Sequence, residues 1–124
     1  MIPKFRAYNP ATNEWYKPEE VFVSDGNIYL DDDDFYELIQ NNDVTLMQST
    51  GKMDSTGKVE VYVGDILYYP DQDEDNYGII KFDEDKLAFV LDNGYERFVY
   101  GDYGMGKVIG NIYENPELLE ATDS

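Results

Sequence analysis

Short apolar segments separated by turn residues dominate the chain from residue 44 onward, and this pattern constrains the fold most. The segments alternate with a period of two and are rich in Val, Ile, Tyr and Phe, which suit a pleated, half-buried surface. The predicted strands cover residues 44–49, 58–63, 66–69, 78–82, 87–92, 95–100 and 108–113. Short strands at such short spacing predict a mainly β fold with one or two short helices, arranged as a small twisted, SH3-like β-barrel.

Turn signals separate the predicted strands. The Asn-Gly pair at 93–94 lies between two apolar segments and is the strongest hairpin signal, because a type I′ turn needs positive φ at both central residues. By the same argument, the Asp-Gly pair at 25–26 predicts a two-residue hairpin between strands at 21–24 and 27–30. The Gly-Asp pair at 64–65 is similar to the tight turn of SH3-like barrels.

Two short helices are also expected. In residues 34–41, apolar side chains at Phe35 and three and four positions later share one helical face. Asp34 can cap this helix, and Glu37 follows three residues later as in a capping box. Residues 115–119 predict a short closing helix, with Asn as the cap and Pro at the first position.

The length of 124 residues predicts one domain, and 42% hydrophobic residues can build a core without metals or disulfides. We expect an N-terminal strand, hairpin and short helix over about 1–43, a β-barrel-like part over about 44–120, and a frayed tail at 121–124. No apolar run approaches the roughly 18 residues needed to span a membrane. The first residues lack the apolar segment of a signal peptide, so we expect a cytoplasmic protein.

The net charge of −18 comes from 27 acidic and nine basic side chains. Spread evenly over roughly 6,800 Å² of folded surface, it amounts to one net charge per patch about 19 Å across. The Debye length in the cell is about 8 Å, so the charge produces a strong field only where carboxylates cluster. With so few Lys and Arg to release counterions from phosphates, direct binding to nucleic acid is not expected.

The chain contains no His and no Cys. It therefore lacks the usual general base near pH 7, a thiol nucleophile and a zinc site built on thiolates. We expect a protein that acts by binding rather than by catalysis, without a cofactor.

Tyrosines flank an acidic loop in the middle of the chain. If residues 77–82 pair with the strand ending at Tyr69, the loop at 71–75 becomes a hairpin tip, and a second acidic cluster at 83–85 lies at the opposite end. Such a surface suits the Arg and Lys side chains of a basic protein partner, through ion pairs and cation–π contacts. The alternative is a β surface with ordinary cross-strand tyrosine pairs. The candidate partner-binding residues are Tyr68, Tyr69, Asp71, Asp73, Glu74, Asp75, Tyr77, Asp83, Glu84 and Asp85.

The alternating aspartates of the same loop resemble the start of a calcium loop. However, position six is Asn76, where Gly is required, and position twelve is Phe82, where a bidentate Glu is required. A loose calcium site is the minor alternative. The aspartates at 31–34 are consecutive and point in different directions, so they do not predict a metal site either.

Three stretches carry a resemblance to a known family. They are Lys-Phe-Arg-Ala-Tyr at 4–8, the segment from Leu-Met-Gln-Ser-Thr-Gly to Gly-Asp-Ile at 46–66, and Val-Ile-Gly-Asn-Ile-Tyr-Glu-Asn-Pro-Glu-Leu-Leu at 108–119. Together they resemble the YopX family of phage and prophage proteins, except in the region after Tyr69. The resemblance implies a phage genome, a β-rich fold with an SH3-like part, and self-association. It implies no catalytic residues.

Two classes of function follow. The first is an acidic inhibitor or adaptor that binds a host nucleic-acid-binding defence enzyme, as anti-restriction and anti-CRISPR proteins do. It requires carboxylates clustered on one face and binding that salt weakens steeply. The second is a self-assembling homo-oligomer in which the charge only maintains solubility. A small-ligand-binding module is a third alternative.

Overall fold

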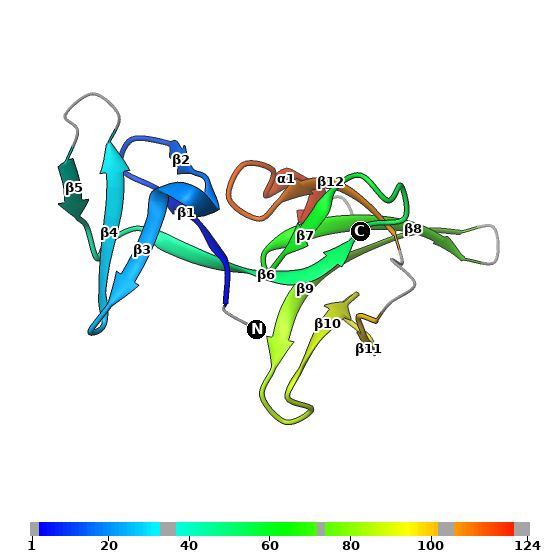
Figure 1. The fold of residues 1–124 in the computed structure, drawn as a ribbon. Coiled ribbons are helices and arrows are strands. Elements are labelled where there is room, and N and C mark those ends of the chain that lie inside the picture. Colours follow the sequence, from blue (N-terminus) through cyan, green and yellow to red (C-terminus); the bar gives the residue numbers. More distant parts are fainter. Residues whose placement is uncertain (1–2, 33–36, 72–73, 102–105, 121–124) are drawn as a thin grey trace. The chain divides into compact units, whose positions relative to one another are not determined.

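The computed structural model describes residues 3–32, 37–71, 74–101 and 106–120 (Figure 1). Strands make up most of this part of the chain, which confirms the mainly β class. The chain divides into two compact units, an N-terminal unit of residues 1–48 and a C-terminal unit of residues 49–124. None of the helices in the described ranges is both long and apolar enough to cross a membrane.

The N-terminal unit is built from two small antiparallel sheets. One pairs β1 with β2 and with the start of β6, and the other has the order β3-β4-β5. Ala7, Leu30 and Val44 form its buried core. The elements are β1 (Phe5–Asn9), β2 (Glu14–Tyr16), η1 (Pro18–Glu20), β3 (Val21–Ser24), β4 (Asn27–Asp32), β5 (Glu37–Gln40) and the first residues of β6 (Thr45–Met53).

The hairpin predicted at residues 25–26 is present. Asp25 and Gly26 have φ values of 51° and 79°, as a type I′ turn requires, and Ser24 pairs with Asn27 on either side of them. In contrast, strand β2 was not predicted from the sequence. Its three residues do not form an alternating apolar pattern bounded by turn residues.

The prediction of a helix at residues 34–41 is wrong for the residues of this range that the structure describes. Residues Glu37–Gln40 form strand β5, in which Ile39 lies opposite Leu30 of β4. An isolated helix of eight residues is marginal in water, whereas pairing with β4 provides the segment with backbone partners. The proposed cap Asp34 lies outside the described residues.

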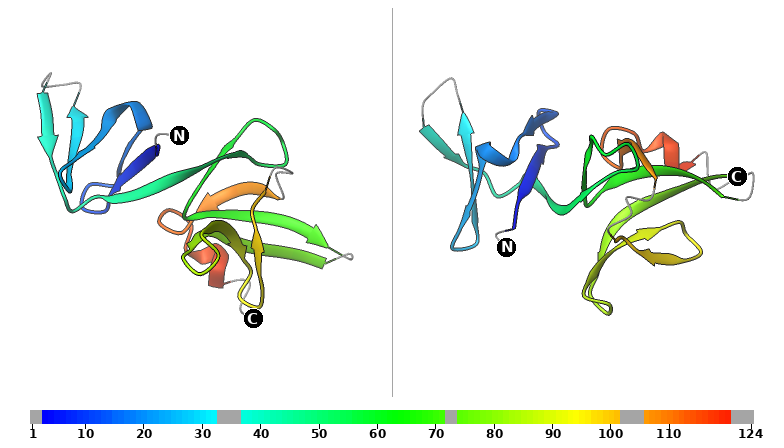
Figure 2. Two further views of the ribbon diagram at one scale, coloured as in Figure 1. Left: turned by 60° about the horizontal axis from the view of Figure 1, so that its bottom comes forward. Right: turned by 45° about the vertical axis from the view of Figure 1, so that its right-hand side comes forward.

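The C-terminal unit contains a five-stranded antiparallel sheet with the order β11-β10-β9-β8-β12, which curls into a half-barrel (Figure 2). Its core includes Val61, Leu67, Ile80 and Leu91, all of which are fully buried. The elements are the end of β6, then β7 (Glu60–Tyr62), β8 (Asp65–Asp71), β9 (Glu74–Asp83), β10 (Ala88–Asp92), β11 (Arg97–Val99), β12 (Lys107–Asn111) and α1 (Glu117–Glu120).

Two local predictions in this unit need correction. The hairpin at residues 93–94 exists, but its loop has four residues, since Asp92 pairs with Arg97 and the β11 strand starts there rather than at residue 95. The closing helix is a single turn at Glu117–Glu120. The carboxamide oxygen of Asn115 accepts a hydrogen bond from the backbone N–H of Asn111 at 3.2 Å, so this side chain closes the preceding turn.

Candidate functional site

Strands β8 and β9 form the hairpin that the sequence predicted. Tyr68 lies opposite Tyr77 and Pro70 lies opposite Asp75, so the acidic loop is the tip of this hairpin. Figure 1 shows the two strands side by side towards the tip of the hairpin, whereas the end of β9 continues past β8 to pair with β10. Asp73 lies outside the described residues.

Tyr68, Asp75 and Tyr77 form an ordered surface, which we call the hairpin face. The rings of Tyr68 and Tyr77 are 5.5 Å apart with an interplanar angle of 52°. The Tyr68 hydroxyl donates a hydrogen bond of 2.7 Å to Oδ1 of Asp75. This hydrogen bond raises the pKa of Tyr68, since losing the phenolic proton would place two negative charges side by side. The tyrosines and the carboxylate are therefore held together by contacts within the chain.

Tyr69 belongs to a different environment. Because side chains alternate along a strand, it points to the opposite side of the sheet from Tyr68. It is only 8% exposed and packs in the core cluster with Leu67 and Ile80. Its hydroxyl oxygen accepts a hydrogen bond of 3.0 Å from Nδ2 of Asn93. The structure therefore separates Tyr69 from the other two tyrosines with which the sequence grouped it.

The second acidic cluster lies at the far end of β9. Asp83 accepts backbone N–H bonds from Lys86 and Asp85 and a bond of 3.3 Å from Nη1 of Arg97. These contacts, led by the Lys86 N–H, lower the pKa of Asp83 despite its burial. Asp83 thus holds the turn between β9 and β10, whereas Glu84 and Asp85 are exposed.

The two acidic clusters are too far apart to act as one site. Eight residue steps along β9 separate Asp75 from Asp83, which at about 3.3 Å per residue is about 26 Å. That distance is about three Debye lengths at physiological ionic strength. The fields of the two clusters therefore do not reinforce one another, and each has to be considered separately.

Several acidic side chains of the C-terminal unit stabilise the fold. Asp65 is 1% exposed and accepts the backbone N–H of Tyr62 at 2.8 Å. Asp92 binds Nζ of Lys81 and Nε of Arg97, both at 3.1 Å. These residue types are common on surfaces, so the sequence did not distinguish structural carboxylates from free ones.

The net charge per residue is nearly the same in the two units. Residues 1–48 have ten acidic and three basic side chains, a net charge of −7, and residues 49–124 have seventeen and six, a net charge of −11. Any electrostatic specificity must therefore come from local groupings such as the hairpin face.

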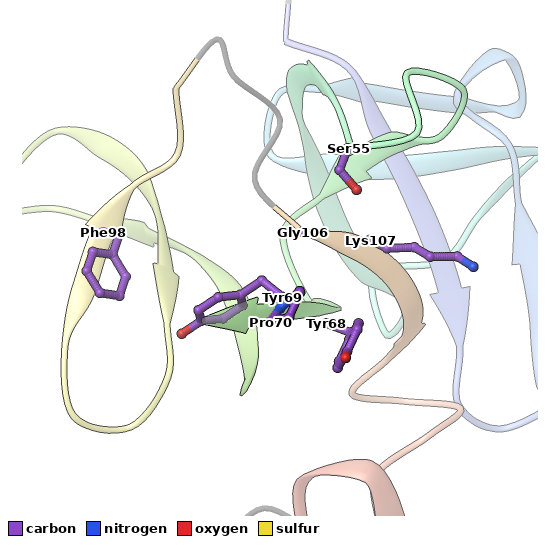
Figure 3. Close-up of a pocket in the computed structure, with 7 residues that line it drawn as sticks. All are labelled: Ser55, Tyr68, Tyr69, Pro70, Phe98, Gly106 and Lys107. Atoms are coloured by element: carbon purple, nitrogen blue, oxygen red, sulfur yellow. The ribbon is translucent and has the colours of Figure 1, made fainter. Parts of the chain in front are cut away.

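A pocket of about 560 Å³ lies beside the hairpin face (Figure 3). Its walls come from β8, β11, β12 and the turn after β6. In Figure 3 the Lys107 side chain extends away from Phe98 and Tyr69, leaving aromatic rings as the main surface. The lining residues are Ser55, Tyr68, Tyr69, Pro70, Phe98, Gly106 and Lys107. This pocket could not be predicted from the sequence, because its walls are far apart in the chain.

The described residues contain no group of three or more His, Cys, Asp or Glu side chains that could hold a metal ion. Asp75 lies in a paired strand of the hairpin, opposite Pro70.

Comparison with known proteins supports the resemblance noted from the sequence. The chain matches the YopX protein family over residues 4–120. It is similar to the crystal structure of protein EF1440 from Enterococcus faecalis, with 27% identity and a TM-score of 0.70 over 96% of this chain and 99% of that one. It shares its fold with protein yopX from Bacillus subtilis, with 22% identity and a TM-score of 0.61 over 94% and 95% of the two chains. No curated protein matches the chain. The chain therefore belongs to the YopX family.

Proposed function

We propose that this protein is a phage or prophage accessory protein that acts in the host cytoplasm by binding a basic protein, and not by catalysis. The observation that carries the proposal is the hairpin face, where Asp75 fixes the Tyr68 hydroxyl and Tyr77 packs against the Tyr68 ring. An arginine of a partner can stack on such a ring while it pairs with the adjacent carboxylate.

The partner class that fits best is a host nucleic-acid-binding defence enzyme of the restriction or CRISPR type. Such an enzyme has a channel lined with Lys and Arg for phosphates. A protein with a net charge of −18 is steered towards that channel, and the steering weakens as salt rises. Blocking the channel inhibits the enzyme without any chemistry by the inhibitor.

A pair of charge-matched variants tests this proposal. Asp75→Asn, near the start of β9, and Asp85→Asn, in the turn that follows β9, each remove one negative charge. Binding to a panel of purified basic host nucleases is measured at low and high salt. We expect Asp75→Asn to weaken binding at low salt by about threefold to tenfold and Asp85→Asn by less than about twofold. Equal effects of the two variants would show that only the overall charge matters. No binding to any of these nucleases at low salt would refute the proposal.

Self-assembly is a second candidate, which a different observation favours. The outer strands of the β3-β4-β5 sheet have exposed apolar side chains, among them Val23 at 49% and Leu38 at 54% exposure. Unpaired edge strands are templates for pairing with another copy. If the protein is a defined multimer by light scattering, Leu38→Lys should dissociate it, whereas Leu87→Lys, at the 79% exposed Leu87 of the C-terminal unit, should not. A strict monomer over all concentrations would exclude this candidate.

A further inference from the structure

Strand β9 has a neighbour on both sides along only part of its length. β8 pairs with residues 74–79 of β9, whereas β10 pairs only with residues 79–83. After Asp92 the chain turns into β11, so no described strand lies beside residues 74–78 on the side away from β8 (Figure 1). We call this side of residues 74–78 the open edge.

The pairing pattern shows which backbone groups face the open edge. The carbonyl of Phe89 in β10 accepts a bond of 2.8 Å from the backbone N–H that follows β11, so Phe89 faces β11. Because direction alternates along a strand, Asp92 faces β9, and its partner Ile79 faces β10. By the same alternation, the N–H and C=O groups of Tyr77 and Asp75 face away from β8, towards the open edge.

Side chains partly close the two outer edges of this sheet. On β12, the backbone N–H of Val108 donates to Oδ2 of Asp54 at 3.1 Å. On β11, the carbonyl of Arg97 accepts a bond of 3.3 Å from the Lys86 ammonium group. In contrast, no hydrogen bond from another described residue reaches the outward backbone groups of β9 at the open edge. Such an edge is a template for an added strand.

An added strand would place alternate side chains on the hairpin face. Directly opposed residues of neighbouring strands point to the same side, with Cβ atoms about 4.5–5.5 Å apart. Tyr68 uses one of about four lone-pair positions of the Asp75 carboxylate, which leaves others for a cation opposite Asp75. Tyr68 lies on the β8 side of Tyr77, so a guanidinium opposite Tyr77 can stack from the open edge.

Charge favours a basic strand over a second copy of this chain. The C-terminal unit has a net charge of −11, and the exposed Asp75 lies at the open edge itself. If Asp75 and Tyr77 of one copy paired with Tyr77 and Asp75 of another, the two carboxylates would be diagonal neighbours about 7–8 Å apart. That distance is within one Debye length, so the carboxylates would repel one another. Lys107 does not cancel this charge, because two strand spacings, about 10 Å, separate it from β9.

We infer that the open edge binds an extended basic segment of the partner as an added β-strand, with arginines at alternate positions opposite Asp75 and Tyr77. The backbone groups of these two residues hold the segment, and the hairpin face selects its side chains. This inference rests on the proposed function and names the part of the partner that is bound and its conformation.

A labelled peptide, acetyl-Thr-Arg-Val-Arg-Val-amide, is a suitable probe, measured by fluorescence anisotropy with the full chain at low salt. In the added strand, the N–H groups of both arginines face β9, whereas those of both valines face away. Methylating the two arginine backbone nitrogens should therefore weaken binding at least about tenfold. Methylating the two valine nitrogens should weaken it less than about threefold. The two methylated peptides have the same mass and charge, so they are matched controls.

A pair of variants tests the same bonds from the side of the protein. Asp75→Asn and Asp75→Pro both remove the carboxylate, but only proline also removes the outward N–H. Proline is tolerated in edge strands where the N–H faces solvent. We expect Asp75→Pro to bind the unmodified peptide about fivefold more weakly than Asp75→Asn does. Asp85→Asn should change binding by less than about twofold.

Amide hydrogen exchange locates the bound peptide. The unmodified peptide should slow exchange of the Asp75 and Tyr77 amides at least about fivefold, and leave Ile79, which already pairs with β10, unchanged. Exchange at these two amides that slows with rising protein concentration, without peptide, would identify a second copy as the occupant and overturn the inference.

The outcomes separate this inference from the proposed function. If both methylated peptides bind as tightly as the unmodified one, the added strand is wrong, and the hairpin face still binds basic partners through side chains. If the unmodified peptide does not bind at about millimolar concentration, the inference is also wrong, and the nuclease measurements decide the proposed function separately. Thermal unfolding verifies that each variant folds. Should Asp75→Pro fail to fold, the methylated peptides and hydrogen exchange in the unmodified protein decide the question.

Discussion

Replacing Asp54 by asparagine removes one charge from a buried carboxylate at the turn between β6 and β7. Asp54 is 3% exposed. Its Oδ1 accepts the backbone N–H of Thr56 at 3.0 Å and the Thr56 hydroxyl, while its Oδ2 accepts the N–H of Val108 at 3.1 Å. Asparagine has only one acceptor oxygen, so its NH₂ group must face a donor on one side.

The expected loss of stability follows from this mismatch between the donors and the single acceptor oxygen of asparagine. One hydrogen bond to a charged acceptor is lost, and a backbone N–H is left without an acceptor, which together cost about 2 kcal/mol. The C-terminal unit of residues 49–124 has a size for which each kcal/mol corresponds to roughly 4–8 °C in Tm. We therefore expect Asp54→Asn to lower the Tm of this unit by about 8–16 °C near pH 7.

The pH dependence gives a second measurement. Burial alone raises the pKa of Asp54, but the hydrogen bonds from Thr56 and Val108 together outweigh it, so the pKa lies below its usual value. The stabilisation is therefore complete above the unfolded-state pKa of about 3.9 and is lost as the pH falls through the folded value. The gap in stability between the natural protein and Asp54→Asn should narrow below about pH 4.

Urea and thermal unfolding followed by circular dichroism measure both effects. Asp85→Asn is the matched control, because it removes the same charge from an exposed side chain and so reports the general relief of charge repulsion. A Tm shift for Asp54→Asn no larger than that of Asp85→Asn would refute the reasoning. A stability gap that stays constant down to low pH would refute the assignment to the ionised carboxylate.

Three further predictions concern the backbone and the surface. Gly110→Ala should destabilise the protein by about 1–3 kcal/mol in urea titrations, because the new Cβ would lie 2.3 Å from the side-chain oxygen of Asn115. Gly26→Ala should cost about 1 kcal/mol through its φ of +79° alone, since no atom lies within 4 Å of the new Cβ, and a cost near zero would contradict this. Arg97→Gln should lower the Tm slightly at low salt and not at high salt, because the half-exposed Arg97 pairs with Asp83 and Asp92.

The candidate site was predicted in part. The pairing of β8 with β9 could be predicted because turn residues separate two apolar strands, so the acidic tip and the tyrosines beside it were found. The role of Asp83 was not found, because its partner Arg97 is fourteen residues away on another strand. The pocket was missed for the same reason, since Tyr69 and Phe98, which both line it, lie on different strands far apart in the chain.

The sequence by itself determined the acidity, the β-rich class and the turn at residues 25–26. This turn follows from backbone preferences of two residues, and such preferences need no distant partner. Only the tertiary structure decided that residues Glu37–Gln40 form a strand, since β4 provides their hydrogen-bond partners. The tertiary structure was also needed to decide which carboxylates stabilise the fold and which are exposed. The physical reason is that burial and ion pairing depend on residues far apart in the chain, which a one-dimensional pattern does not bring together.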